Sequence, residues 1–234
     1  MKIRKDLYLL SGGYYGQLGN VYGIKYEKGC ILFDCGREKS YQTIVENLSY
    51  WGMDEGSVTH VFLTHGHDDH GGSAAQFQKN GSKIIVGRED AYMMEQGSFG
   101  KDSPFQNHVM PCCSPDVLLE GDQEIKIGSI TVRAYHMPGH TDGSCIYLAE
   151  TAEGSYLFTG DMFICDGEEG NEALIWWKGD LTYSGEKLQK SFARLWSMNL
   201  KPDVVAGGHG NPRIGRDAGE MIMIAYKEFL KNHR

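Results

Sequence analysis

Short apolar runs alternate with amphipathic stretches along the chain, and this pattern predicts strands interleaved with helices. In the first part we expect strands over residues 7–10, 20–26 and 30–33, an amphipathic helix over 40–51 and a buried strand over 61–63. Beyond these, the pattern predicts, in chain order, helix 73–78, strand 83–86, helix 88–96, strands 124–127, 130–136, 145–149 and 156–158, helix 186–198, strand 204–206 and helix 218–231. No internal repeat interrupts the order, and we expect one domain over residues 1–234.

Two segments lack a clean period and are predicted to be irregular. Residues 98–117 hold glycine, three prolines and an adjacent cysteine pair, and we expect an excursion there with His108 at the surface. Residues 162–183 carry several acidic and aromatic side chains, and we expect substrate specificity to depend on them.

The run Val61-Phe62-Leu63 leads into Thr64-His65-Gly66-His67-Asp68-Asp69-His70-Gly71-Gly72, which is the most informative stretch of the chain. On extended backbone, His65 and His67 point to the same side and can bind one cation. Asp69 and His70 follow after the chain turns and are placed to face a second cation. Three of the nine histidines fall within six residues, which disfavours a merely polar turn.

The motif His65-x-His67-x-Asp69-His70 resembles the signature of the metallo-β-lactamase-fold superfamily. Four further motifs extend the resemblance over nearly the whole chain. They are Asp34 in Leu32-Phe33-Asp34-Cys35-Gly36, His140 in Pro138-Gly139-His140, Asp161 in Phe158-Thr159-Gly160-Asp161, and His209 in Gly207-Gly208-His209-Gly210. The fold that this resemblance implies is an α/β architecture, an αββα sandwich of two mixed sheets flanked by helices.

The same resemblance implies a ligand set for two divalent cations, of which Zn²⁺ is expected first and Fe or Mn are alternatives. The first cation would take His65, His67 and His140, the second would take Asp69, His70 and His209, and Asp161 would bridge them. Asp69, Asp161 and Asp34 are the expected catalytic carboxylates. Asp34 is expected to accept a hydrogen bond from a ligand histidine, although an aspartate before Gly36 could instead cap a turn.

Aromatic side chains near two loops are candidates for the substrate pocket. Trp176 and Trp177 follow the bridging aspartate and could stack on an acyl or aromatic group, but packing under the loop as a small separate core explains them equally well. Tyr14 and Tyr15, flanked by glycines, are candidates for a second wall of the same pocket.

Composition limits the function classes. A formal net charge of −8 disfavours nucleic-acid binding, and the short apolar run near the N-terminus is too short for a membrane span or a signal peptide. We therefore expect a cytoplasmic protein that binds a small-molecule substrate and that could form a homodimer. Six scattered cysteines without a CxxC pair are expected to be free thiols, and Cys112-Cys113 is more simply a pair of small apolar side chains than a redox site.

The leading functional hypothesis is a binuclear hydrolase that uses a metal-bridging hydroxide to cleave an ester, thioester or lactone. By resemblance the chain is similar to the glyoxalase II branch, but it lacks the Gly-Cys-Gly-Arg stretch after Asp161 and the C-terminal extension that binds glutathione. Two alternatives stay open at this stage. One is a persulfide dioxygenase-like enzyme with a single iron, and the other is a non-catalytic, metal-holding effector protein.

Overall fold

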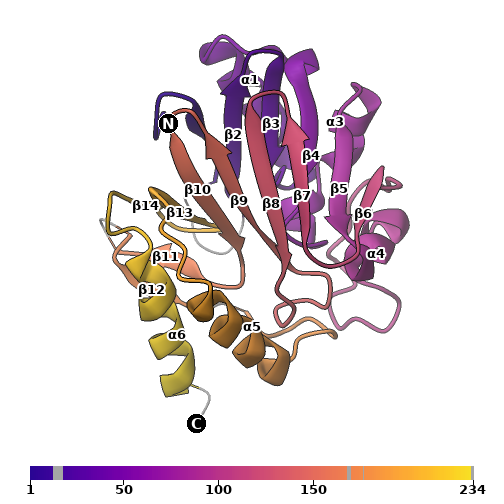
Figure 1. Cartoon of the computed structure of the whole chain (residues 1–234). Coiled ribbons are helices and arrows are strands. Elements are labelled where there is room, and N and C mark those ends of the chain that lie inside the picture. Colours follow the sequence, from indigo (N-terminus) through magenta and orange to yellow (C-terminus); the bar gives the residue numbers. More distant parts are fainter. Residues whose placement is uncertain (13–17, 168–169, 176, 233–234) are drawn as a thin grey trace.

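Two six-stranded sheets pack face to face in the computed structural model, which describes residues 1–12, 18–167, 170–175 and 177–232 (Figure 1). The first sheet has the order β1 (Leu7–Ser11), β2 (Val21–Tyr26), β3 (Gly29–Phe33), β4 (Val58–Phe62), β5 (Lys83–Gly87) and β6 (Val117–Leu119). The second has the order β14 (Arg213–Ile214), β13 (Val204–Gly207), β10 (Gly154–Gly160), β9 (Cys145–Thr151), β8 (Ile130–His136) and β7 (Gln123–Ile127). A separate two-stranded ribbon joins β11 (Ile164–Asp166) to β12 (Glu172–Leu174).

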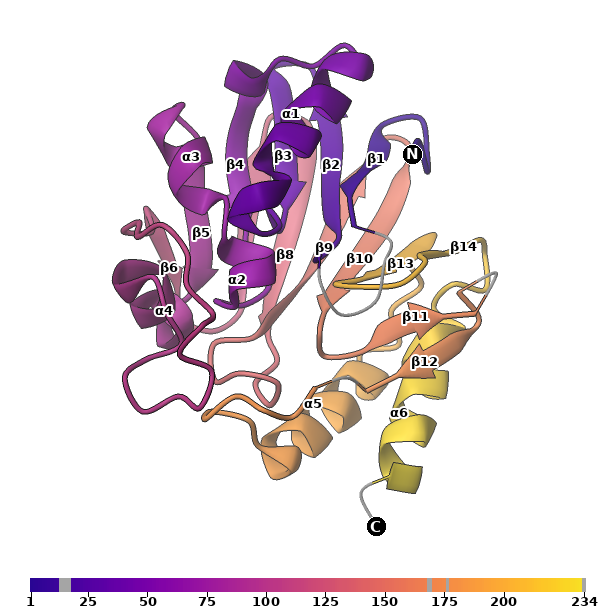
Figure 2. The same cartoon turned by 180° about the vertical axis from the view of Figure 1, so that it is seen from behind.

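Helices cover the outer face of each sheet. On the first sheet these are α1 (Tyr41–Tyr50), α2 (Asp68–Gly71), α3 (Ala74–Lys79) and α4 (Ala91–Gln96), seen in front in Figure 2. On the second sheet they are α5 (Gly185–Ser197) and α6 (Glu220–Asn232), whose buried Phe192 and Phe229 pack with Val205 of β13. Three short 3₁₀ turns occupy Glu38–Ser40, Glu55–Ser57 and Arg88–Asp90. The predicted αββα sandwich is therefore confirmed.

The core between the sheets is aromatic. Phe33 stacks on Phe158 across the two sheets with ring centroids 3.8 Å apart, and Phe62 and Tyr147 pack beside them. All four side chains are buried, and stacked pairs of this kind contribute about 0.5–1.5 kcal/mol beyond the area that they bury. Because Phe33 and Phe62 are the last residues of β3 and β4, this packing fixes the points from which Asp34 and the histidine motif project.

Most of the predicted elements are found within one to three residues of their expected limits, and the exceptions are short. Strands β6, β11, β12 and β14 have two or three residues, which is too short for an alternating pattern to show. The strand expected over 61–63 starts earlier, at Val58, and ends at Phe62, so the backbone at His65 bends and is not a strand. None of the described helices is both long and apolar enough to cross a membrane.

Candidate metal centre

Five loops meet at one edge of the sandwich because the strands before them run in the same direction. Strands β3, β4, β5 and β6 are mutually parallel in the first sheet, and β10 and β13 are parallel in the second. The carboxyl ends of such strands lie at a common edge. Asp34 follows β3, the histidine motif follows β4, His140 follows β8, Asp161 follows β10, and His209 follows β13.

Three imidazoles form a first cluster, composed of His65, His67 and His140. Nε2 of His65 lies 2.9 Å from Nδ1 of His67, and Nε2 of His140 lies 3.2 Å from the same atom. Nitrogen ligands of a tetrahedral zinc are about 3.3 Å apart, given Zn–N bonds of about 2.0–2.1 Å. The three ring nitrogens therefore converge at a spacing that one cation would fill.

A second cluster lies beside the first and is composed of Asp69, His70 and His209. Nε2 of His209 is 3.2 Å from Oδ2 of Asp69, and Nε2 of His70 is 3.7 Å from the same oxygen. Asp161 lies between the clusters, because its two oxygens are 3.5 Å from Nε2 of His70, 3.4 Å from Nε2 of His209 and 3.9 Å from Nε2 of His140.

Polar atoms in this region are buried without a hydrogen-bond partner among the described residues. They include Nε2 of His70 and Oδ1 of Asp161, which face each other at 3.5 Å. An unpaired buried polar atom costs about 1–3 kcal/mol, and a cation bound between the two atoms would satisfy both. The donor set of imidazoles and carboxylates also suits zinc, iron or manganese, so the seven residues fit two divalent metals.

The histidine pKa values are shifted in opposite directions in the two clusters. Burial, reinforced in each case by neighbouring imidazoles, lowers the pKa of His65 well below its ordinary value and lowers the pKa of His140 to about 4. Burial also lowers the pKa of His70, but the carboxylates of Asp69, Asp161 and Asp34 outweigh it and raise that pKa well above its ordinary value. In the same way the Asp161 carboxylate outweighs burial at His209 and raises its pKa to about 9. Without metal, His65 and His140 are therefore neutral near pH 7, whereas His70 and His209 hold protons.

Asp34 supports the second cluster from behind. Its Oδ2 lies 2.9 Å from Nδ1 of His70, so that Nε2 of this ring faces Asp69 and Asp161. Thr64 donates its backbone N–H to Oδ1 of Asp34 at 2.7 Å and its hydroxyl to Oδ2 at 2.9 Å. The residue has a left-handed backbone with φ of 57°, a conformation that aspartate and asparagine adopt more readily than most residues.

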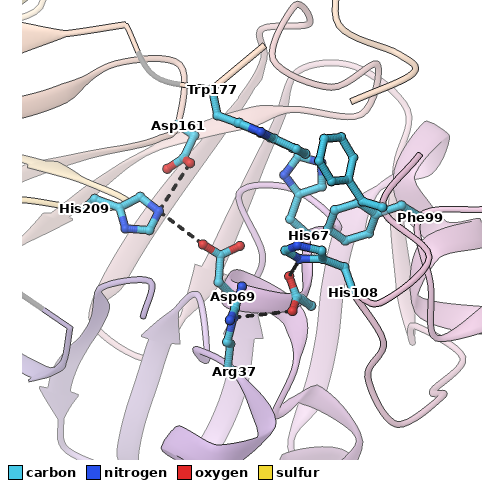
Figure 3. Close-up of a pocket in the computed structure, with 10 residues that line it drawn as sticks. Arg37, His67, Asp69, Phe99, His108, Asp161, Trp177 and His209 are labelled. Atoms are coloured by element: carbon cyan, nitrogen blue, oxygen red, sulfur yellow. Dashed lines mark hydrogen bonds and ion pairs between the residues drawn. The ribbon is translucent and has the colours of Figure 1, made fainter. Parts of the chain in front are cut away.

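The two clusters open into a cavity of about 240 Å³ (Figure 3). Phe99, Phe105 and Trp177 form an aromatic wall, in which Phe99 stacks on His67 with centroids 4.5 Å apart and Trp177 contacts His67 edge-on at 5.2 Å. Trp177 thus lies in the cavity wall. The other pocket candidates, Tyr14, Tyr15 and Trp176, lie outside the described residues.

His108 is half-buried and also lines this cavity, with Nδ1 3.0 Å from Oδ1 of Asp68. His108 was expected at the surface; its side chain is 27% exposed and faces the cavity. The segment that carries His108 folds back over α2. It is held there by an isolated antiparallel β-bridge between Ser98 and Val109 and by a hydrogen bond of 2.9 Å that the Met110 N–H donates to the Gly97 carbonyl.

Comparison with known proteins decides the family. A sequence model of the metallo-β-lactamase superfamily matches residues 14–209. The chain belongs to the metallo-β-lactamase superfamily. It is 28% identical to the uncharacterized protein YobT of Bacillus subtilis over 82% of each chain. It is 27% identical to the probable metallo-hydrolase YqgX of the same organism over 72% of this chain and 78% of that one.

Human metallo-beta-lactamase domain-containing protein 1 is 29% identical over 82% of this chain and 63% of the human protein. Among solved structures, a Cronobacter sakazakii metallo-β-lactamase carrying a HARLDQ motif, in a mutant form, has a TM-score of 0.79 at 15% identity, over 99% of this chain and 93% of that one. BJP-1 of Bradyrhizobium japonicum, a subclass B3 metallo-β-lactamase, has a TM-score of 0.73 at 23% identity, over 98% and 92%. These likenesses show that the chain has the metallo-β-lactamase fold.

Two buried carboxylates position the first cluster, and none of the superfamily motifs in the sequence includes them. Oδ2 of Asp180 lies 2.9 Å from Nε2 of His67, and this contact outweighs burial and lowers the pKa of Asp180. Asp180 comes from the irregular segment before α5, and the only sequence signal for it was the general expectation that this segment matters.

Asp90, at the start of α4, is the other carboxylate. It accepts hydrogen bonds from the Gly66 N–H at 2.9 Å, the Gly143 N–H at 2.8 Å and the Thr141 hydroxyl at 2.7 Å. Burial raises the pKa of Asp90 in spite of these bonds. One carboxylate therefore joins the loop of His65 and His67 to the loop of His140.

Proposed function

We propose that this protein is a binuclear metal-dependent hydrolase that cleaves an ester, thioester or lactone of a small molecule. The observation that carries the proposal is the pair of adjacent clusters, with Asp161 between them, at the base of a small cavity. A structural metal site is closed by protein ligands, whereas a catalytic site keeps an open position. Asp69, Asp161 and His209 each line the cavity, which supports a catalytic role.

When bound, two divalent cations would activate water as a nucleophile and polarise the carbonyl under attack. The chain itself orients the ligands: the contact with Asp34 directs Nε2 of His70 toward Asp161, and the contact with Asp180 directs Nδ1 of His67 toward the first cluster. Asp69 is the more exposed of the two carboxylates in the clusters, at 18% against 5% for the Asp161 side chain. Asp69 is thus the carboxylate that can receive the proton of the attacking water and pass it to the leaving alkoxide or thiolate.

A substrate screen with a loading series tests the proposal. The protein is freed of metal, reloaded with zinc, manganese or ferrous iron, and assayed on 4-nitrophenyl esters, acyl thioesters, lactones, a bis(4-nitrophenyl) phosphodiester and glutathione persulfide. We expect hydrolysis of at least one carboxylic substrate class that requires added metal. Asp161→Asn should lower kcat by about 100-fold or more, because it removes the charge shared by the clusters.

Asp203→Asn is the control, since Asp203 precedes β13 at the opposite end from His209 and contacts Ser155 instead of a ligand. Oxygen consumption with persulfide and one iron per chain would contradict hydrolysis and favour a dioxygenase. Metal binding without turnover of any substrate would favour a non-catalytic protein.

A further inference from the structure

Arg37 forms a third side of the cavity, apart from the metal centre and the aromatic wall. It lies in the loop after β3, three residues beyond Asp34, and its carbonyl accepts hydrogen bonds from the Ser73 hydroxyl and the Ser40 N–H, both at 2.8 Å. In Figure 3 its side chain reaches up beside Asp69, with Phe99 and His108 to one side and Trp177 above. A guanidinium therefore borders the space where a substrate of the metal centre would lie.

Asp68 contacts one of the three nitrogens of this guanidinium and thereby orients the group. Nε of Arg37 lies 3.3 Å from Oδ2 of Asp68, while the other oxygen of Asp68 faces His108. Among the described residues, Asp68 is the ion-pair partner of Arg37, and the contact is made through Nε and not through the two terminal nitrogens. These terminal N–H groups form the fork that binds a carboxylate through two parallel hydrogen bonds.

Charge also favours an anionic ligand. The cavity is lined by the carboxylates of Asp68, Asp69 and Asp161, which by themselves would repel an anion. Two divalent cations, when bound, would together with Arg37 more than offset these three negative charges. The aromatic wall can hold an apolar part of the same molecule.

We propose that Arg37 selects substrates that carry a carboxylate in addition to the bond that is cleaved, with the apolar part of the substrate packed against Phe99 and Trp177. This inference rests on the proposed hydrolase function and names its substrate class. The alternative is that Arg37 only completes an ion pair with Asp68 at the start of α2.

Two matched esters test this selection. 4-Nitrophenyl hydrogen adipate ends its acyl chain in a carboxylate, and 4-nitrophenyl hexanoate has the same chain length without the charge. Arg37→Met should lower kcat/KM for the adipate ester by roughly 10- to 100-fold, as the loss of a charge-assisted hydrogen bond implies, and should change the hexanoate value by less than about threefold. Arg37→Lys keeps the positive charge but not the forked pair of N–H donors, so its kcat/KM for the adipate ester should lie between those of the wild type and Arg37→Met.

Arg133→Met is the matched control, because Arg133 lies on β8 outside the cavity lining and the substitution removes a guanidinium from ion pairs with Glu124 and Glu150. It should leave both esters unchanged. Equal loss on the two esters by Arg37→Met at full metal content, or no loss on either, would overturn the proposal. Should Arg37→Met fail to fold, Arg37→Lys must still lose the adipate preference several-fold.

A binding measurement separates this inference from the proposed function. If wild-type protein hydrolyses neither ester, calorimetric titration of the metal-loaded protein with phenylacetate is the test. We expect Arg37→Met to weaken phenylacetate binding at least tenfold, whereas phenylacetamide binding should not change. Phenylacetate binding that is unaffected by Arg37→Met, and lost only when metal is removed, would assign the carboxylate to the metals and refute the role of Arg37.

Discussion

Asp34→Asn tests whether Asp34, which is not among the seven candidate metal ligands, supports metal binding by orienting His70. Asparagine tolerates the left-handed backbone at this position, and its amide oxygen can still accept the Thr64 N–H. The amide nitrogen, however, would take the place of Oδ2, which faces Nδ1 of His70 at 2.9 Å. Nδ1 must then accept a hydrogen bond, so the ring proton moves to Nε2, the atom that faces the second cluster.

The magnitude follows from the contacts that change. Oδ2 is the charged acceptor for both Nδ1 of His70 and the Thr64 hydroxyl, so up to two hydrogen bonds are lost. At about 1.5–3 kcal/mol each, this lowers the unfolding free energy by about 1.5–6 kcal/mol and, for a chain of this size, the melting temperature by about 3–24 °C. Removing a carboxylate that orients a ligand histidine costs about 10–100-fold in metal affinity. The second cluster should be affected most, because Asp34 contacts His70 directly, whereas it is linked to the first cluster through the Thr64 hydroxyl, which lies 3.0 Å from Nδ1 of His65.

Competition with a chromogenic chelator measures both metal affinities, and thermal unfolding of the metal-free protein gives the stability. Asp203→Asn is the matched control: Asp203 accepts a backbone N–H and a hydroxyl from Ser155, as Asp34 does from Thr64, but none of the histidines that the structure describes contacts it. The control should lose some stability and no metal affinity. Wild-type affinity at both clusters in Asp34→Asn, or equal weakening in the control, would show that Asp34 does not support metal binding through His70.

Three further predictions follow from the site. Asp90→Ala leaves the buried N–H groups of Gly66 and Gly143 unpaired, while the Thr141 hydroxyl keeps its contact with Ser144, and it should lower the unfolding free energy by at least about 2 kcal/mol in urea titrations. Trp177→Ala should raise KM several-fold with unchanged metal content; a large stability loss without a KM effect would instead make Trp177 a packing residue. In metal-free protein the raised pKa of His209, about 9, contributes stability that is present below pH about 6.5 and lost as pH rises through 9. The lowered pKa of His140, about 4, removes stability as pH falls from about 6.5 toward 4. The melting temperature should therefore peak near pH 6.5, and a flat profile would contradict these shifts.

The sequence predicted the parts of the site that local patterns encode. The histidine motif follows directly from a buried strand, and glycine-flanked residues such as His140 and His209 follow others, so strand direction alone brings them to one edge. Glycine is required where chains approach closely: a Cβ on Gly208 would lie 2.2 Å from Oδ1 of Asp161.

The missed residues act across the fold, and no local pattern marks them. Asp180 reaches His67 from 113 positions away, and Asp90 joins two loops that are 77 positions apart. The position of Arg37 in the cavity depends on how the loop after β3 packs against α2, and a lone arginine in the sequence does not show this. Short strands such as β11 and β12 were missed because three residues are too few for a period.

Elemental analysis of the purified protein, run beside a turnover assay, tests whether the protein has a two-metal hydrolytic centre. We expect two divalent metals per chain in the wild type, about one in His209→Ala, and ester, thioester or lactone hydrolysis that falls with the second metal. A wild-type protein that holds a single metal at full hydrolytic activity, or a His209→Ala protein that keeps both metals, would contradict this expectation.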